Sequence, residues 1–130
     1  GGGIGSSLAE ALAGAGAKVV VAGRNEGPCA STVERVRAAG SEGLAVVADV
    51  TVEADCERLV AATVERFGRV DILVNAVGGG AGKALHPAED YPRSDWDWIM
   101  ELNVRSTVVP TQAVVRRMIE QAWICNECGA

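Results

Sequence analysis

Aromatic side chains are scarce in this sequence and make up only 4% of its 130 residues. Alanine, valine and glycine are abundant instead; hydrophobic residues reach 48% and charged residues 22%, which is ordinary for a soluble globular protein. Small and β-branched side chains suit tight packing of helices on a sheet, so the composition favours an α/β protein over a β-sandwich. The length is enough for one domain and too short for two.

The sequence also lacks an excess of basic residues and a long apolar run. Its 12 Lys and Arg residues are outnumbered by 17 Asp and Glu residues, which gives a net charge of −5 and leaves no basic stripe for a phosphate backbone. No apolar stretch approaches the roughly 20 residues that span a bilayer, and no signal peptide is visible. We therefore expect neither a nucleic-acid partner nor a membrane partner.

The four cysteines do not have the spacing of a disulfide framework, which predicts a reducing, cytoplasmic setting. Cys125 and Cys128 resemble one zinc knuckle, but tetrahedral zinc needs four ligands. The other candidate ligands, Cys29, Cys56 and His86, fall within the body of the chain. No metal site is therefore expected, and a zinc-binding tail is kept as an alternative.

Helical and strand-like patterns alternate along the chain. Connections of two to six residues join the first six of them, which favours right-handed crossovers and a parallel sheet covered by helices on both faces. Pro110 is expected to kink the last helix. The predicted helices are 6–15, 28–40, a third that Thr51 caps and Gly68 ends, and 94–121; the predicted buried strands are 18–22, 44–48 and 70–74.

A glycine run opens the chain and predicts a phosphate site. Gly1, Gly2, Gly3, Ile4 and Gly5 lead directly into an alanine-rich helical segment. Glycine permits positive φ and close approach of the backbone to a ligand, and the helix start offers unpaired N–H groups. A dinucleotide-binding turn normally follows a buried strand, so we expect the chain to begin inside such a unit.

Further candidate ligand-binding residues follow each predicted strand. Ligands of parallel α/β sheets bind at the carboxyl ends of the strands, where these loops and the glycine turn are expected to converge on one nucleotide. Each loop alone is a weak signal, and four in register are a stronger one. The residues are Arg24 and Asn25 after the first strand, Asp49 and Val50 after the second, and Asn75, Ala76 and Gly78 after the third.

Together these features resemble the short-chain dehydrogenase/reductase family in its single-domain, NAD(P)-dependent form, over residues 1–119. The last three positions of the family's T-G-x-x-x-G-I-G turn are matched at 3–5, and its adenine-binding Asp-Val at 49–50. Its N-N-A-G signature appears at 75–78 as Asn-Ala-Val-Gly, in which the two middle positions depart from the family. Its helical catalytic asparagine is matched by Asn103.

The resemblance implies a catalytic tetrad, of which this chain carries Asn103 alone. The family works with a serine and a Tyr-x-x-x-Lys pair. Here the single tyrosine, Tyr91, is followed four residues later by Asp95, and the two lysines are Lys18 and Lys83. The family's first strand, its other catalytic residues and its substrate-binding half are therefore expected to be absent from this sequence.

Cofactor choice depends on the loop after the first predicted strand. An NAD enzyme places a carboxylate about 20 residues beyond the glycines, where it binds the ribose 2′-hydroxyl. This chain has Arg24 there, whose guanidinium would pair with a 2′-phosphate, so NADP is predicted. Glu26 leaves NAD possible, and an ordinary solvated role for Arg24 is the alternative.

The expected architecture is a Rossmann-like three-layer α/β/α fold with a parallel sheet, incomplete because the first strand and the C-terminal half are absent. A partial dinucleotide-binding domain is predicted over 1–120 and an unrelated tail over 121–130. The absent strand would lie between the strands at 18–22 and 70–74, so we expect unpaired edges facing a gap, or direct pairing of those two strands.

The expected function is hydride transfer between NADP(H) and an alcohol or ketone substrate by the intact protein, with the chain alone inactive. The intact protein is expected to be a homo-oligomer, since the 94–121 helix resembles the one with which the family pairs its subunits. The alternative is a non-catalytic module that binds a nucleotide or a partner.

Overall fold

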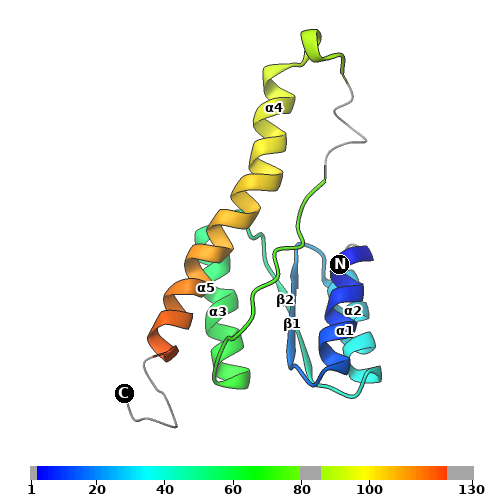
Figure 1. Cartoon of the computed structure of the whole chain (residues 1–130), viewed down its shortest axis with the longest axis vertical. Helices are drawn as coiled ribbons and strands as arrows, with labels where there is room; N and C mark the ends of the chain where they lie inside the picture. Colours follow the sequence, from blue (N-terminus) through cyan, green and yellow to red (C-terminus); the bar gives the residue numbers. More distant parts are fainter. Residues whose placement is uncertain (1–2, 80–85, 123–130) are drawn as a thin grey trace.

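A computed structural model describes residues 3–79 and 86–122, in which helices cover two parallel strands on both faces (Figure 1). Helices α1 (Gly3–Gly14) and α2 (Glu26–Ala38) lie on one face, and α3 (Glu53–Phe67) and α5 (Ser106–Ala122) lie on the other. The strands are β1 (Val19–Gly23) and β2 (Gly43–Val47). This arrangement confirms the predicted incomplete three-layer α/β/α fold.

The two strands pair in parallel because α2 supplies the crossover that parallel pairing requires. Val19 lies opposite Gly43, and Gly23 opposite Val47. Helix α2 approaches β2 closely: a Cβ on Gly43 would lie 3.0 Å from Cγ1 of Val33 and 3.1 Å from Cγ1 of Val36. The glycine at the start of β2 therefore lets α2 bury its apolar side against the sheet.

The predicted third strand at 70–74 is wrong as a sheet element, since the segment pairs with neither β1 nor β2. It follows α3 and runs alongside the sheet (Figure 1). A cavity of about 560 Å³ is lined on one side by β1 and on the other by residues 69–77, with α1, α3 and α5 completing its wall. A strand conformation needs a hydrogen-bonding neighbour, and here the cavity occupies that neighbour's position. The predicted gap is thus present, and direct pairing does not occur.

The last predicted helix is observed as one run of helical residues, with a π-helical turn before Pro110. Helix α4 (Arg93–Met100) continues through a π-helical turn (Glu101–Arg105) into α5, and a short 3₁₀ turn (Ala88–Asp90) precedes it. Pro110 is buried inside α5. A proline cannot donate to the carbonyl four residues earlier, which is that of Ser106, where the π-helical turn ends.

Some predictions concern residues that the structure does not describe. Gly1, Gly2, Lys83, Cys125 and Cys128 lie outside the described residues, as does most of the predicted tail at 121–130. Across 3–79 and 86–122, no helix combines the length and hydrophobicity that crossing a bilayer would require.

Candidate functional site

The four predicted ligand-binding segments lie at one end of the strands. Figure 1 shows α1 beginning near the end of the sheet where β1 finishes, and the segment after α3 runs to that same end of the sheet. The loops that follow β1 and β2 are there as well, since the strands are parallel. The fold therefore gathers residues that are up to 75 positions apart, from Gly3 to Gly78, around the amino end of α1.

The glycine turn lies against the 75–78 segment. A Cβ on Gly5 would lie 3.4 Å from Cβ of Ala76, so the start of α1 touches this segment directly. Helix α1 begins at Gly3, and Ile4 is 78% exposed. The first N–H groups of a helix have no partner inside the helix, so this end of α1 presents donors to whatever binds there.

Asn103, on the π-helical turn, holds the far end of the 75–79 segment. Its Oδ1 accepts a hydrogen bond from the Gly79 N–H at 3.0 Å. Its Nδ2 donates to the carbonyls of Gly79 at 3.0 Å and Ile99 at 2.9 Å. A Cβ on Gly78 would lie only 2.8 Å from this Oδ1, so a side chain at position 78 would displace the Asn103 amide from its present position. The side chain that the resemblance assigns to catalysis is thus engaged here by main-chain groups.

Two further side chains of α5 bond to the chain between Val70 and Asn75, and sequence reasoning did not find either of them. Asn75 Nδ2 donates to Thr111 Oγ1 at 2.9 Å. Gln121 Oε1 accepts from the Val70 N–H at 3.0 Å, and Gln121 Nε2 donates to the Val70 carbonyl. Polar residues at 103, 107 and 111 recur every four positions, and that spacing on one helix face was the available signal.

Asp49 is held in place after β2 by hydrogen bonds on either side. Its Oδ1 accepts from the Thr51 N–H at 3.0 Å and from the Thr51 hydroxyl at 2.8 Å. Its own N–H donates to Asp55 Oδ2 at 2.7 Å. The bonds from Thr51 hold the pKa of the Asp49 carboxyl below its ordinary value, and the charge of Arg24 acts in the same direction. Asp49 therefore offers an ionised carboxylate, and the bonds from Thr51 engage only its Oδ1.

Arg24 and Asn25 are exposed in the loop between β1 and α2. Within the described residues, the guanidinium of Arg24 has no hydrogen-bond partner or ion pair, although its charge reaches Asp49. Asn25 is the N-cap residue of α2 but makes no capping hydrogen bond with its side chain. Val50 is half-buried beside Asp49. Arg24 is therefore positioned to meet an anion without first breaking an existing ion pair.

The depressed pKa of Asp49 predicts an acid-sensitive contribution to stability. An aspartate in an unfolded chain titrates near 3.9, so in acid the unfolded state binds more protons and stability falls as pH falls. This contribution is complete above that value and is lost as the pH drops through the lower folded value. We expect Asp49→Asn to flatten the dependence of the urea midpoint on pH between about pH 5 and pH 2.

A matched control for this prediction is Glu57→Gln, which changes an exposed carboxyl on α3 outside the candidate site. It should retain the slope of the unaltered chain. An Asp49→Asn variant whose midpoint falls with acid as steeply as that of the unaltered chain would contradict the assignment.

A family model and several curated proteins match this chain. A family model described as short chain dehydrogenase matches residues 1–124. Among curated relatives, a CLA biosynthesis dehydrogenase/reductase of Lactiplantibacillus plantarum is 37% identical over 121 residues. A rhamnolipids biosynthesis 3-oxoacyl-[acyl-carrier-protein] reductase of Pseudomonas aeruginosa is 43% identical over 104 residues. These matches cover 92% and 80% of the present chain.

Solved structures of a dehydrogenase and a reductase also superpose on this chain. An NAD⁺-bound xylitol dehydrogenase superposes with a TM-score of 0.86 at 32% identity, covering 92% of this chain and 45% of that one. The NADH-dependent reductase A1-R′ complexed with NAD superposes with a TM-score of 0.79 at 34% identity, covering 93% and 50%. The chain spans 41% and 39% of the length of the two curated relatives.

Proposed function

The chain belongs to the short-chain dehydrogenase family, and on that premise we propose that it forms part of an NADP(H)-binding unit of an oxidoreductase for an alcohol or ketone. The observation that carries the proposal is the meeting of the glycine turn with the 75–79 segment at one end of the strands. When bound, the nicotinamide would supply or accept the hydride. The chain's own residues supply binding and orientation.

The start of α1 is suited to the pyrophosphate of the cofactor. Its first N–H groups are unpaired within the helix and lie at the positive end of the helix dipole. Gly3 and Gly5 carry no side chain that would keep a phosphate at a distance. Ala76 next to Gly5 brings the 75–78 backbone to the same place, where it is proposed to contact the ribose.

The carboxylate of Asp49 and the adjoining Val50 are suited to the adenine. A carboxylate oxygen accepts a hydrogen bond from an exocyclic amine, and the Thr51 bonds keep Asp49 ionised and fixed in orientation. Val50 adds a half-buried apolar contact for the ring. Asn103 positions the nearby segment through Gly79 and would be the chain's single contribution to the catalytic residues.

Arg24 supports NADP over NAD as the cofactor. Its exposed guanidinium is free of ion pairs among the described residues and could form a bidentate contact with a 2′-phosphate. The two structural relatives named above are described as bound to NAD, so the preference for NADP would distinguish this chain from them. Glu26, at the start of α2, is the residue that would serve NAD instead.

Isothermal titration calorimetry of the purified chain with NADPH and with NADH tests the proposal. Binding of NADPH in the micromolar range, tighter than that of NADH, is the expected result. Absence of binding to both cofactors would overturn it. A fragment that cannot bind the cofactor by itself would then be favoured.

We expect the purified 130-residue chain to show no ketone-dependent oxidation of NADPH. The family's Tyr-x-x-x-Lys pair is absent, so no group is present to transfer the hydroxyl proton and hold the nicotinamide ribose. Loss of NADPH absorbance in the presence of a ketone checks this, with cofactor alone as the control. A rate above that control would contradict the expectation.

The long helix supports assembly of the intact protein into a homo-oligomer. Six apolar side chains along α4, the π-helical turn and α5 are between 39% and 56% exposed, which favours a surface that a partner covers. The side chains are Trp96, Met100, Val104, Val108, Val115 and Ile119. Light scattering measures the state of association directly.

The buried free thiols of Cys29 and Cys56 suit the reducing, cytoplasmic setting that we also propose.

A further inference from the structure

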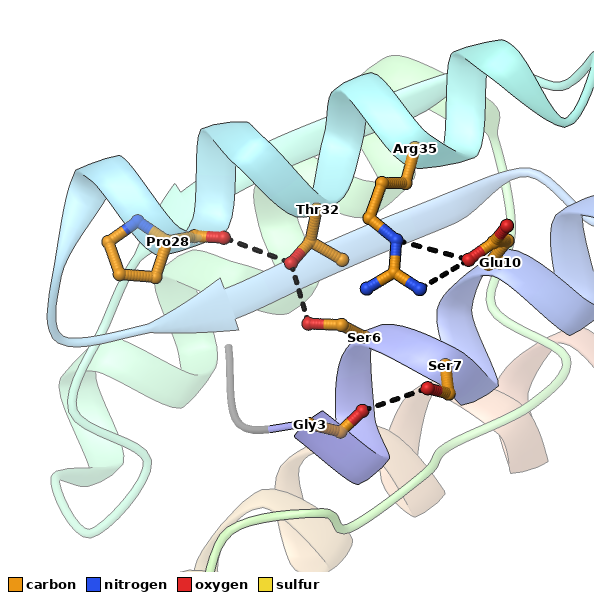
Figure 2. A network of polar contacts seen from close by, with 7 residues as sticks. All are labelled: Gly3, Ser6, Ser7, Glu10, Pro28, Thr32 and Arg35. Carbon is orange, nitrogen blue, oxygen red and sulfur yellow. Dashed lines mark hydrogen bonds and ion pairs between the residues drawn. The ribbon is translucent and has the colours of Figure 1, made fainter.

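Two buried hydroxyl groups join α1 to α2 next to the glycine turn. Ser6 is 7% exposed and Thr32 is 3% exposed, and their side-chain oxygens are 2.9 Å apart. Figure 2 shows the two side chains pointing toward one another across the interface between the helices. Among the described residues, the only other buried polar side chain is that of Ser106, so a buried polar pair is an exceptional feature of this core.

The direction of this bond follows from the proton count. The Thr32 hydroxyl donates its one proton to the carbonyl of Pro28 at 2.9 Å. Ser6 must therefore be the donor to Thr32 Oγ1, and the chain of bonds runs from Ser6 through Thr32 to Pro28 (Figure 2). Breaking either link would remove a hydrogen-bond partner from a buried polar group, which is unfavourable.

The two ends of this chain of bonds lie beside two parts of the proposed cofactor site. Ser6 directly follows Gly5, at the end of the glycine turn. Pro28 is in the first turn of α2, which follows the loop that carries Arg24. The bond thus connects the turn proposed to bind pyrophosphate to the loop proposed to bind the ribose 2′-phosphate.

We propose that Ser6 and Thr32 are positioning residues that hold the glycine turn and the Arg24 loop at the spacing that NADP requires, which rests on the proposed function. NADPH must contact both parts at once: its pyrophosphate the start of α1 and its 2′-phosphate Arg24. NADH has no 2′-phosphate, so a shift of α1 against α2 affects it less. The hydroxyl pair therefore contributes to the preference for NADPH, beyond any contribution to stability.

A second link between the helices lies farther along them. Arg35 Nε donates to Glu10 Oε2 at 3.0 Å, and both side chains are about half exposed. Exposed ion pairs of this kind contribute little rigidity. The buried hydroxyl pair, and not this ion pair, is the polar contact next to the first turn of α1.

The test compares Ser6→Ala and Thr32→Val with Ser7→Ala. Ser7 is exposed in the same turn and its hydroxyl donates only to the Gly3 carbonyl at 3.0 Å, so this variant controls for losing a serine there. Calorimetry gives the Kd for NADPH and for NADH, and urea unfolding gives stability. We expect Ser6→Ala and Thr32→Val each to lower the ratio of NADPH to NADH affinity by about 3- to 10-fold, the equivalent of one hydrogen bond.

The remaining variants distinguish a loss of positioning of the two helices from a general loss of stability. The double variant should lower the ratio no further than either single variant, because both changes remove one bond. Thr32→Ser keeps the hydroxyl, so its ratio of NADPH to NADH affinity should equal that of the unaltered chain. Equal losses of affinity for both cofactors, or an effect of Ser7→Ala as large as that of Ser6→Ala, would overturn the inference. Failure of the unaltered chain to bind either cofactor would instead overturn the proposed function on which it rests.

Discussion

Replacing Arg24 by glutamate is expected to weaken binding of NADPH by about 100-fold, because a charge-assisted contact of about 1.5–3 kcal/mol is lost and a like charge replaces it. Arg24 is exposed just after β1 and has no ion pair within the described residues, so on the proposed function its guanidinium would meet the 2′-phosphate directly. Affinity for NADH should change by less than about 3-fold, since no phosphate is present at that position. Calorimetry with the two cofactors measures both effects.

The control for this prediction makes the same change of charge elsewhere. Arg116 is exposed on α5, which packs on the opposite face of the sheet from α1 and α2. Arg116→Glu should leave the ratio of the two affinities unchanged. If Arg24→Glu weakens the binding of NADPH and NADH equally, Arg24 does not contact the 2′-phosphate, and the proposal that this chain binds NADP fails.

A strand supplied to the cavity beside β1 is expected to raise the melting temperature by about 10 °C, since each kcal/mol shifts Tm by about 4 °C in a domain of this size. The cavity is lined by β1 on one side and residues 69–77 on the other, and neither backbone has a sheet neighbour there. Five apolar residues in that position would bury their side chains and form hydrogen bonds on two edges. The net gain after chain entropy is about 3 kcal/mol.

The experiment extends the chain in front of Gly1 by a five-residue valine- and isoleucine-rich strand and a short turn. The matched control has the same length with serine at the five apolar positions. Thermal unfolding followed by circular dichroism compares the two, and hydrogen exchange of the β1 amides reports whether the new edge is paired. Equal melting temperatures for both extensions would contradict the prediction. Without an extension, we expect marginal stability and a tendency to aggregate through the unpaired edge of β1.

Local sequence signals were sufficient for most of the elements and for the loops that carry the candidate site. The β-branched run that begins at Lys18 and the one that begins at Leu44 correspond to β1 and β2 within one residue at each end. Helix starts were less well predicted. Thr51 is the predicted cap of the third helix, but the N-cap residue of α3 is Val52, and the Thr51 hydroxyl donates to Asp49 instead.

Long-range contacts account for what sequence reasoning missed. Nothing in the residues 70–74 distinguishes a paired strand from an unpaired one, because pairing depends on a neighbour that is distant in sequence or missing. The bonds of Thr111 and Gln121 to the 70–75 segment span 36 and 51 positions, and the Ser6 bond to Thr32 spans 26. Such partners are set by how helices pack, which single-residue preferences do not specify.

The sequence by itself determined the class of fold, the alternation of helices and strands, the glycine turn and the polar residues that end each strand. These follow from local periodicity and from residue types whose chemistry acts at short range. Only the tertiary structure decided that the 70–79 segment stays out of the sheet, that Asn103 bonds to Gly79, and that Ser6 meets Thr32. The reason is that a cavity, a main-chain clamp and a buried hydroxyl pair each require two or more elements in fixed relative positions.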